Sequence, residues 1–121
     1  MASSNMRPVC VAVVAASLSM VSAAPPLRVV TTTSDLAALA RELGGQRVEV
    51  RAICSGLEDP HMVQGKPSFI LAARDADLWI RIGLDLEIGW EPVVIESSRN
   101  SRILPGRPGH LDAGLLIEPL D

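Results

Sequence analysis

Apolar and polar positions alternate between strand-like and helix-like periodicities in the first part of this chain. Residues 27–33 (LRVVTTT) are rich in β-branched side chains, which predicts a first strand. Ser34 is a good N-cap and Gly44-Gly45 is a typical C-terminal stop, so we expect a helix between them. The apolar positions of this helix recur at i, i+3, i+4 and i+7, as an amphipathic helix requires: Leu36, Leu39, Ala40 and Leu43.

Two further strands are predicted around a loop and a short helix. Residues 48–54 (VEVRAIC) predict the second strand, because apolar side chains alternate with charged ones. A looser stretch containing Gly and Pro follows, and Ser68 then predicts the cap of a short helix. Residues 77–82 (DLWIRI) predict the third strand.

The last third of the chain has a weaker pattern. Residues 84–98 predict a third helix, which Pro92 should kink or interrupt because proline lacks an amide hydrogen. Residues 101–104 predict a short fourth strand, and the Pro- and Gly-rich stretch that begins at Pro105 predicts a loop. Strand and helix signals thus alternate, which predicts one α/β domain with a parallel, doubly wound sheet over residues 24–121.

Residues 1–23 have the features of a signal peptide. Arg7 precedes an apolar stretch, and Val21-Ser22-Ala23 fits the small-residue rule for cleavage after Ala23. An uncleaved membrane anchor is the alternative, but the stretch is shorter than the roughly 20 residues that a membrane span needs. Cys10 lies inside the apolar stretch, and its surroundings do not resemble a lipoprotein cleavage site. We therefore expect an exported, periplasmic protein.

Composition narrows the classes of function. Without residues 1–23 the chain keeps ten basic and fourteen acidic side chains, no basic stripe and three aromatic residues. Nucleic-acid binding is therefore not indicated. Cys54 is then the one cysteine, so no internal disulfide can form. It is either a buried thiol or a reactive or metal-binding one.

The loop after the second predicted strand carries the main candidate for a metal ligand. His61 ends the segment GLEDPH, beyond the carboxyl end of a strand, where open α/β sheets bind their ligands. Neutral imidazole offers a nitrogen lone pair to zinc, manganese or copper. An ordinary surface histidine is the alternative. Cys54 and His61 lack an orienting third residue, and no HExxH or CxxC motif occurs, so we do not expect an enzyme.

Other polar residues allow two interpretations each. Glu58 and Asp59 are either oxygen ligands beside His61 or members of a solvated acidic loop. His110 is either a ligand or a residue of a surface loop. The hydroxyls of residues 31–34 suit anion binding or the support of a site, but strand formation and helix capping explain them equally.

Ordered segments of the chain point to a known family. They are LRVVTTTSDLA (27–37), GGQRVEV (44–50), EDPH (58–61) followed by KPS (66–68), and ADLW (76–79) followed by GLDLE (83–87). Together they resemble the start of the periplasmic metal receptors of ABC-type zinc and manganese importers. The resemblance covers essentially all of residues 27–90.

The resemblance implies a receptor of two α/β lobes joined by a long helix, with the metal held in the cleft. It implies that His61 is the first metal ligand, that zinc or manganese is the transported ligand, and that a membrane permease is the partner. No organic cofactor is implied. The family's other ligands come from a second histidine and from the second lobe. No counterpart of these occurs here, and His110 does not lie in a matching motif.

Two interpretations therefore remain open. In the first, residues 24–121 are a partial N-terminal lobe that takes part in extracytoplasmic capture of zinc or manganese. In the second, the chain is a truncated remnant or an interaction module without useful metal binding. A partial lobe is also expected to expose a sheet edge that invites aggregation. A metal-dependent hydrolase is a distant third interpretation, because no residue is placed as a general base.

Overall fold

The computed structural model describes residues 23–120 of the chain. The predicted signal peptide and Cys10 therefore lie outside the described residues, except for Ala23 at the proposed cleavage point. Within the described part of the chain, no helix is both long and apolar enough to cross a membrane.

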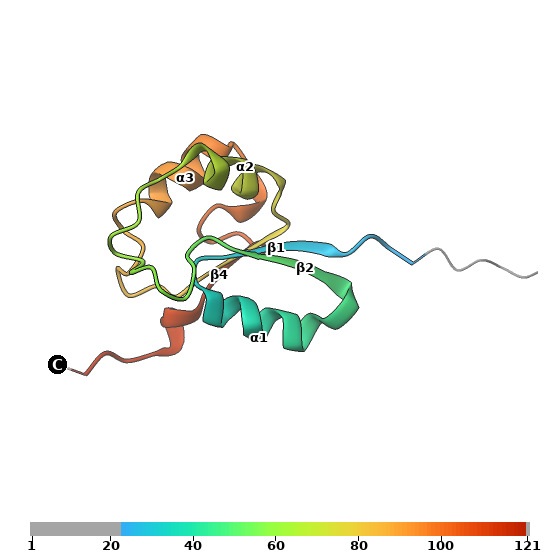
Figure 1. Cartoon of the computed structure of the whole chain (residues 1–121), viewed down its shortest axis with the longest axis horizontal. Helices are drawn as coiled ribbons and strands as arrows, with labels where there is room; N and C mark the ends of the chain where they lie inside the picture. The colour runs from blue at the N-terminus through green and yellow to red at the C-terminus, as the bar shows by residue number, and fades with distance from the viewer. Residues whose placement is uncertain (1–22, 121) are drawn as a thin grey trace, which may run out of the picture.

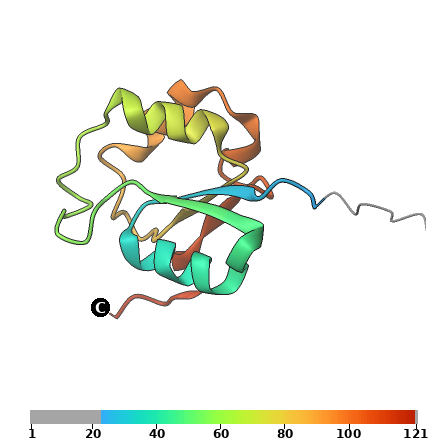
Figure 2. The same ribbon diagram turned by 45° about the vertical axis from the view of Figure 1, so that its right-hand side comes forward.

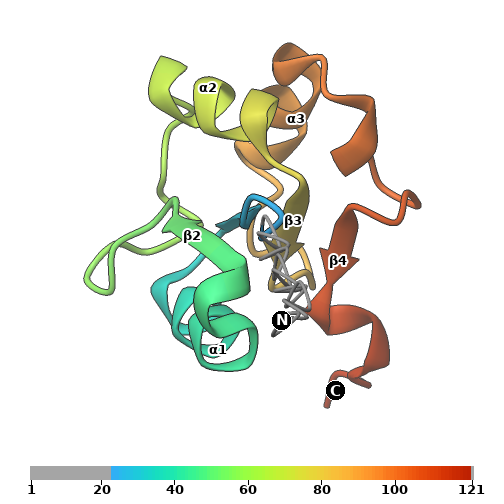
Figure 3. The same cartoon turned by 90° about the vertical axis from the view of Figure 1, so that its right-hand side faces the viewer.

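One parallel sheet forms the centre of the molecule, with helices on both faces, as the sequence predicts (Figure 1). The strand order is β2-β1-β3-β4, with β1 at Leu27–Thr31, β2 at Val48–Ala52, β3 at Leu78–Arg81 and β4 at His110–Asp112. Helix α1 (Ser34–Gly44) lies on one face, and α2 (Pro67–Asp75) and α3 (Glu91–Ser98) lie on the other (Figure 3). The α/β class and the parallel, doubly wound topology are confirmed.

Helix α1 occupies the predicted segment but differs in its cap and in its buried face. Thr33, not Ser34, is the N-cap, and its hydroxyl accepts from the amide of Leu36. Gly45 ends the helix with a φ of 52°, a conformation that glycine adopts without steric cost. Ala37 is fully buried, whereas Leu39 and Leu43 are exposed. The predicted apolar stripe is thus only partly covered.

The two edges of the sheet differ in their protection. Strand β2 forms one edge, and its alternation matches the prediction, with Glu49 and Arg51 exposed. The guanidinium of Arg41, on α1, donates to the carbonyl of Val50 at 3.0 Å. A long cationic side chain therefore occupies a main-chain acceptor of this edge strand. Strand β4 forms the other edge and is only three residues long.

The segment predicted as a helix over residues 84–98 is helical only in its second half. Gly83, Leu84 and Asp85 have φ angles of 83°, 53° and 64°, so the chain passes through three consecutive left-handed residues. A right-handed helix cannot begin there, and α3 starts at Glu91. Pro92 falls in the first turn of α3, where no amide donor is needed, so it does not kink the helix as predicted.

The fourth strand lies later than predicted. Ser101–Ile103 forms a 3₁₀ turn rather than a strand, and it inserts the fully buried Ile103 into the core. The strand is instead β4, inside the stretch predicted as a loop, where His110 is in register with Trp79. A further 3₁₀ turn, Ala113–Leu116, follows it. Helix α2 also starts earlier than predicted, with Lys66 rather than Ser68 at the N-cap.

The hydrophobic core lies between the sheet and helices α2 and α3. Trp79 and Trp90 are both buried, and their rings lie 6.4 Å apart. The ring of Phe69, on α2, lies 5.9 Å from that of Trp90. Tilted aromatic pairs of this kind are favourable beyond their buried area. The core therefore fixes the position of Trp90, which precedes α3.

Asn100 joins α3 to the end of α2. Its amide nitrogen donates to the carbonyls of Ala73 (2.9 Å) and Ala76 (2.7 Å), and its oxygen accepts from the amide of Arg102 (3.1 Å). The side chain of Asn100 thus bonds main-chain groups of two segments, and it is the donor to the carbonyl of Ala76, which follows α2.

We expect Asn100→Ala to lower the free energy of unfolding by about 1–3 kcal/mol, because the buried carbonyl of Ala76 loses its donor and that of Ala73 loses one of two. Urea denaturation followed by circular dichroism measures the change. Ser97→Ala, at an exposed position of α3, is the matched control and should change stability by less than about 0.5 kcal/mol. Equal effects of the two substitutions contradict the role of Asn100.

Candidate metal-binding site

The loop that joins β2 to α2 extends beyond the carboxyl end of the strand (Figure 2). His61 lies in this loop. Its side chain is 57% exposed. The amide of His61 donates to Oδ1 of Asp59 at 2.9 Å, and the same oxygen lies 3.9 Å from Nδ1 of the imidazole. The ring is thus accessible to a solvated ion and has a carboxylate as its neighbour.

Short-range hydrogen bonds give the loop its shape. The amide of Ser55 donates to Oε2 of Glu58 at 2.8 Å, and the amide of Met62 donates to the carbonyl of Asp59 at 2.9 Å. The bond from the Ser55 amide is the main cause that lowers the pKa of Glu58. Glu58 therefore points back toward its own loop start, whereas Asp59 lies beside His61.

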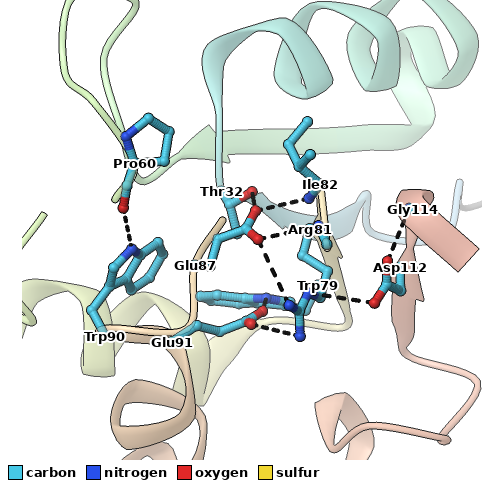
Figure 4. A network of polar contacts seen from close by, with 11 residues as sticks. Thr32, Pro60, Trp79, Arg81, Ile82, Glu87, Trp90, Glu91, Asp112 and Gly114 are labelled. Carbon is cyan, nitrogen blue, oxygen red and sulfur yellow. Dashed lines mark hydrogen bonds and ion pairs between the residues drawn. The ribbon is translucent and has the colours of Figure 1, made fainter. Parts of the chain in front are cut away.

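Trp90 ties this loop to the core. The indole Nε1 of Trp90 donates to the carbonyl of Pro60 at 2.8 Å (Figure 4). Pro60 immediately precedes His61, so the bond fixes the main chain next to the candidate ligand.

A buried carboxylate organises the neighbouring ends of β1 and β3. Glu87 is fully buried and accepts at 2.6 Å from the hydroxyl of Thr32. It also accepts from the amide of Ile82 at 2.8 Å (Figure 4). The amide of Gly83 donates to the same carboxylate at 3.1 Å. A buried carboxylate needs such donors to offset the loss of hydration. The turn after β3 is therefore held against the end of β1.

Arg81 supplies the countercharge. Its guanidinium lies 2.9 Å from Glu91, 3.5 Å from Asp112 and 3.8 Å from Glu87. One cation thus serves three carboxylates. Burial is the main cause that raises the pKa of Glu91, and it outweighs the lowering effects of the Trp79 indole, which donates to Glu91 at 2.7 Å, and of Arg81.

The hydroxyls predicted as possible support for a ligand are used inside the protein. Thr31 donates to the carbonyl of Thr33, Thr32 donates to Glu87, and Thr33 caps α1. Helix capping accounts for Thr33, whereas the hydroxyl of Thr32 supports the buried carboxylate of Glu87.

The remaining candidates do not join His61. Cys54 is 1% exposed, and burial, with a smaller contribution from Glu58, raises the pKa of its thiol to about 11. Cys54 is therefore the buried thiol, and not the reactive or metal-binding one, of the two alternatives for this residue. His110 is half-buried in β4, with Nδ1 2.8 Å from the carbonyl of Ile103. Across residues 23–120, no group of three or more His, Cys, Asp and Glu side chains could hold a metal ion.

Sequence reasoning missed the roles of Glu87 and Trp90. Both lie in the segment predicted as a helix over residues 84–98, in which neither side chain is assigned a role. The signal that could have identified them is Gly83 followed by Glu87, because a glycine after a strand often marks a turn whose free amides need an acceptor.

The raised pKa of Glu91 predicts a pH dependence of stability. The folded state holds this proton more tightly than the unfolded state does, so the contribution of Glu91 to stability falls as pH rises from the ordinary glutamate pKa through the raised one. Glu91→Gln removes the titration and keeps an acceptor for Trp79. We therefore expect the unfolding free energy of Glu91→Gln, relative to the unsubstituted protein, to increase with pH over this interval.

Urea denaturation between pH 4 and pH 8 tests this expectation. Glu96→Gln, at an exposed position of the same helix, is the control and should show no such trend. The expectation is contradicted if the unfolding free energy of Glu91→Gln minus that of the unsubstituted protein stays constant or falls as pH rises.

Comparison with known proteins identifies relatives of this fold. The family model described as zinc-uptake complex component A, periplasmic, matches residues 29–112. The manganese ABC transporter substrate-binding lipoprotein PsaA of Streptococcus pneumoniae is 34% identical over 68 residues, which are 56% of this chain and 22% of PsaA. FimA of Streptococcus parasanguinis, a metal ABC transporter substrate-binding lipoprotein, is 35% identical over 63 residues, or 52% of this chain and 20% of FimA.

Solved structures share this fold. The crystal structure of ZnuA superposes with a TM-score of 0.63 at 21% identity, covering 79% of this chain and 35% of ZnuA. The periplasmic zinc-binding protein TroA of Treponema pallidum superposes with a TM-score of 0.57 at 26% identity, covering 64% of this chain and 27% of TroA. This chain therefore spans only about a fifth of the curated relatives and about a third of the solved ZnuA chain.

The family model matches well over half of the residues, and the parallel sheet agrees with it. The chain therefore belongs to the family of periplasmic zinc-uptake components, the metal-binding receptors of ABC-type importers.

Proposed function

We propose that this chain captures a divalent transition metal, zinc or manganese, outside the cytoplasm for delivery to an ABC-type permease. His61 contributes one imidazole nitrogen. The observation that carries the proposal is the exposed imidazole of His61 at the carboxyl end of a parallel sheet, in a member of this family. Ligands of open α/β sheets bind at this edge.

The chemistry of the loop suits a metal that is bound and released. Imidazole nitrogen is a ligand for zinc and for manganese, and Asp59 places a carboxylate oxygen 3.9 Å from the ring. A single imidazole completed by water holds zinc more weakly than a four-ligand site does. Tight binding therefore depends on ligands that the described residues do not supply.

Either metal is compatible with these ligands. Zinc favours nitrogen and sulfur ligands, whereas manganese accepts more oxygen. The relative PsaA is named for manganese and TroA for zinc. The proposed role requires binding and release only, without an organic cofactor or a chemical step. It also requires export, for which we propose cleavage of the signal peptide after Ala23.

A remnant or interaction module without useful metal binding is the second candidate. One observation favours it: among the described residues, His61 does not belong to a group of three or more His, Cys, Asp and Glu side chains that could hold a metal ion. The two candidates differ in whether the purified chain binds zinc through His61.

Calorimetric titration of the purified chain with zinc tests the proposal. We expect a measurable heat for the unsubstituted protein and its loss in His61→Ala, with unchanged circular dichroism because the side chain is exposed. The loss should exceed the roughly 10- to 100-fold fall that typically follows removal of a residue that only supports a ligand.

The matched control is His110→Gln, which removes the other histidine while its amide can still donate to the carbonyl of Ile103. This variant should keep the zinc heat. Heats that are identical in the unsubstituted protein and His61→Ala remove His61 from the site. No heat in any variant favours the remnant.

A further inference from the structure

Among the described residues, the loop that carries His61 makes one long-range hydrogen bond to the rest of the molecule. Between residues 55 and 65, every other hydrogen bond of the described structure joins groups within three positions of each other. The bond from Trp90 Nε1 to the carbonyl of Pro60 spans 30 residues and leads into the core. Val63 also packs this loop against the hydrophobic core, and the indole N–H adds the directional contact that fixes the main chain beside His61.

The donor itself is held rigidly. Trp90 is 2% exposed and packs against the rings of Phe69 and Trp79. Its amide donates to the carbonyl of Glu87 at 3.2 Å, and its own carbonyl accepts from Val94 at 3.2 Å. A donor with so little freedom can fix the acceptor that it binds.

The turn before Trp90 is anchored at the strand ends. Glu87 is held by Thr32 on one strand and by the amides of Ile82 and Gly83 after another. Gly89 also faces the loop, since a side-chain carbon built there would lie 3.8 Å from the carbonyl oxygen of His61. A continuous set of contacts thus runs from the carboxyl ends of β1 and β3 through Glu87 and Trp90 to Pro60.

We propose that Trp90 is a positioning residue for the metal ligand His61. Trp90 does not touch the metal; it fixes the main chain at Pro60, and so limits where the adjacent imidazole can lie. This inference rests on the proposed function of His61. A ligand whose position is fixed before binding loses less conformational freedom on coordination, which raises affinity. The same hydrogen bond makes the indole sensitive to events at His61.

Trp90→Phe tests the role, because it keeps an aromatic ring in the core and removes only the N–H donor and part of the ring. The chain offers a matched control in Trp79→Phe, which also removes a buried indole donor, but one that binds Glu91 rather than the loop. Both variants should lose some global stability, so stability alone does not distinguish them.

The first readout is independent of metal. Amide hydrogen exchange of residues 55–65, measured without zinc, should become roughly tenfold faster in Trp90→Phe than in Trp79→Phe after correction for global stability. Equal protection of the loop in the two variants overturns the positioning role.

The second readout is affinity for zinc. We expect Trp90→Phe to bind zinc roughly tenfold more weakly than Trp79→Phe, in the range usual for residues that support a ligand. Equal zinc affinities overturn the proposal, even if the loop exchanges faster. If the loop exchanges faster in Trp90→Phe but no variant binds zinc, the proposed function is contradicted. The structural role of the hydrogen bond is then still supported.

A third readout leaves Trp90 in place, in case Trp90→Phe does not fold. The chain has two tryptophans and no tyrosine, so Trp79→Phe reports the fluorescence of Trp90 alone. Zinc has a filled d shell and no redox chemistry, so a change in emission reports the surroundings of the indole. Zinc should shift the emission of Trp79→Phe and leave that of Trp79→Phe/His61→Ala unchanged. If Trp79→Phe still binds zinc by calorimetry but zinc does not change its emission, the coupling between His61 and Trp90 is overturned.

Discussion

The structure at the carboxyl ends of the strands depends on the hydrogen bonds that the buried carboxylate of Glu87 accepts. Three donors from two strand ends converge on it, namely one hydroxyl and two main-chain amides. Without these bonds a fully buried carboxylate carries a desolvation cost that the core cannot offset. With them, the strained turn of Leu84 and Asp85 is held in its left-handed conformation, and Trp90 is delivered to the loop that carries His61.

Charge around this carboxylate is balanced unevenly. Arg81 lies among Glu87, Glu91 and Asp112, so the cluster contains more acidic groups than cations. Burial is the main cause of the raised pKa of Glu91, and the carboxylates of Glu87 and Asp112 raise it further against the lowering effect of Arg81. Glu87 differs from Glu91 in its donors, since main-chain amides and a hydroxyl surround it in addition to the shared guanidinium.

Short-range patterns predicted the first half of the fold well and the second half poorly. Residues 27–54 carry strand alternation, capping residues and a glycine stop, each of which acts locally. The errors arise where contacts between residues far apart in sequence determine the secondary structure. The start of α3 depends on left-handed residues that Glu87 holds, and β4 is a strand only because Trp79 and its neighbours pair with it. His61 could be identified from its motif, but the roles of Trp90 and Glu87 follow from contacts 30 and 55 residues apart in sequence.

The guanidinium that Arg41 places on the carbonyl of Val50 has a consequence for self-association. An incoming strand can grow on a sheet only where main-chain acceptors are free, and one acceptor of β2 is already taken by a bulky cation. Strand β4 is protected differently, because it is only three residues long and the amide of His110 already donates to the carbonyl of Arg107 at 3.0 Å. A strand added at either side of the sheet would therefore meet a main-chain group that is already hydrogen-bonded, which disfavours edge-to-edge growth.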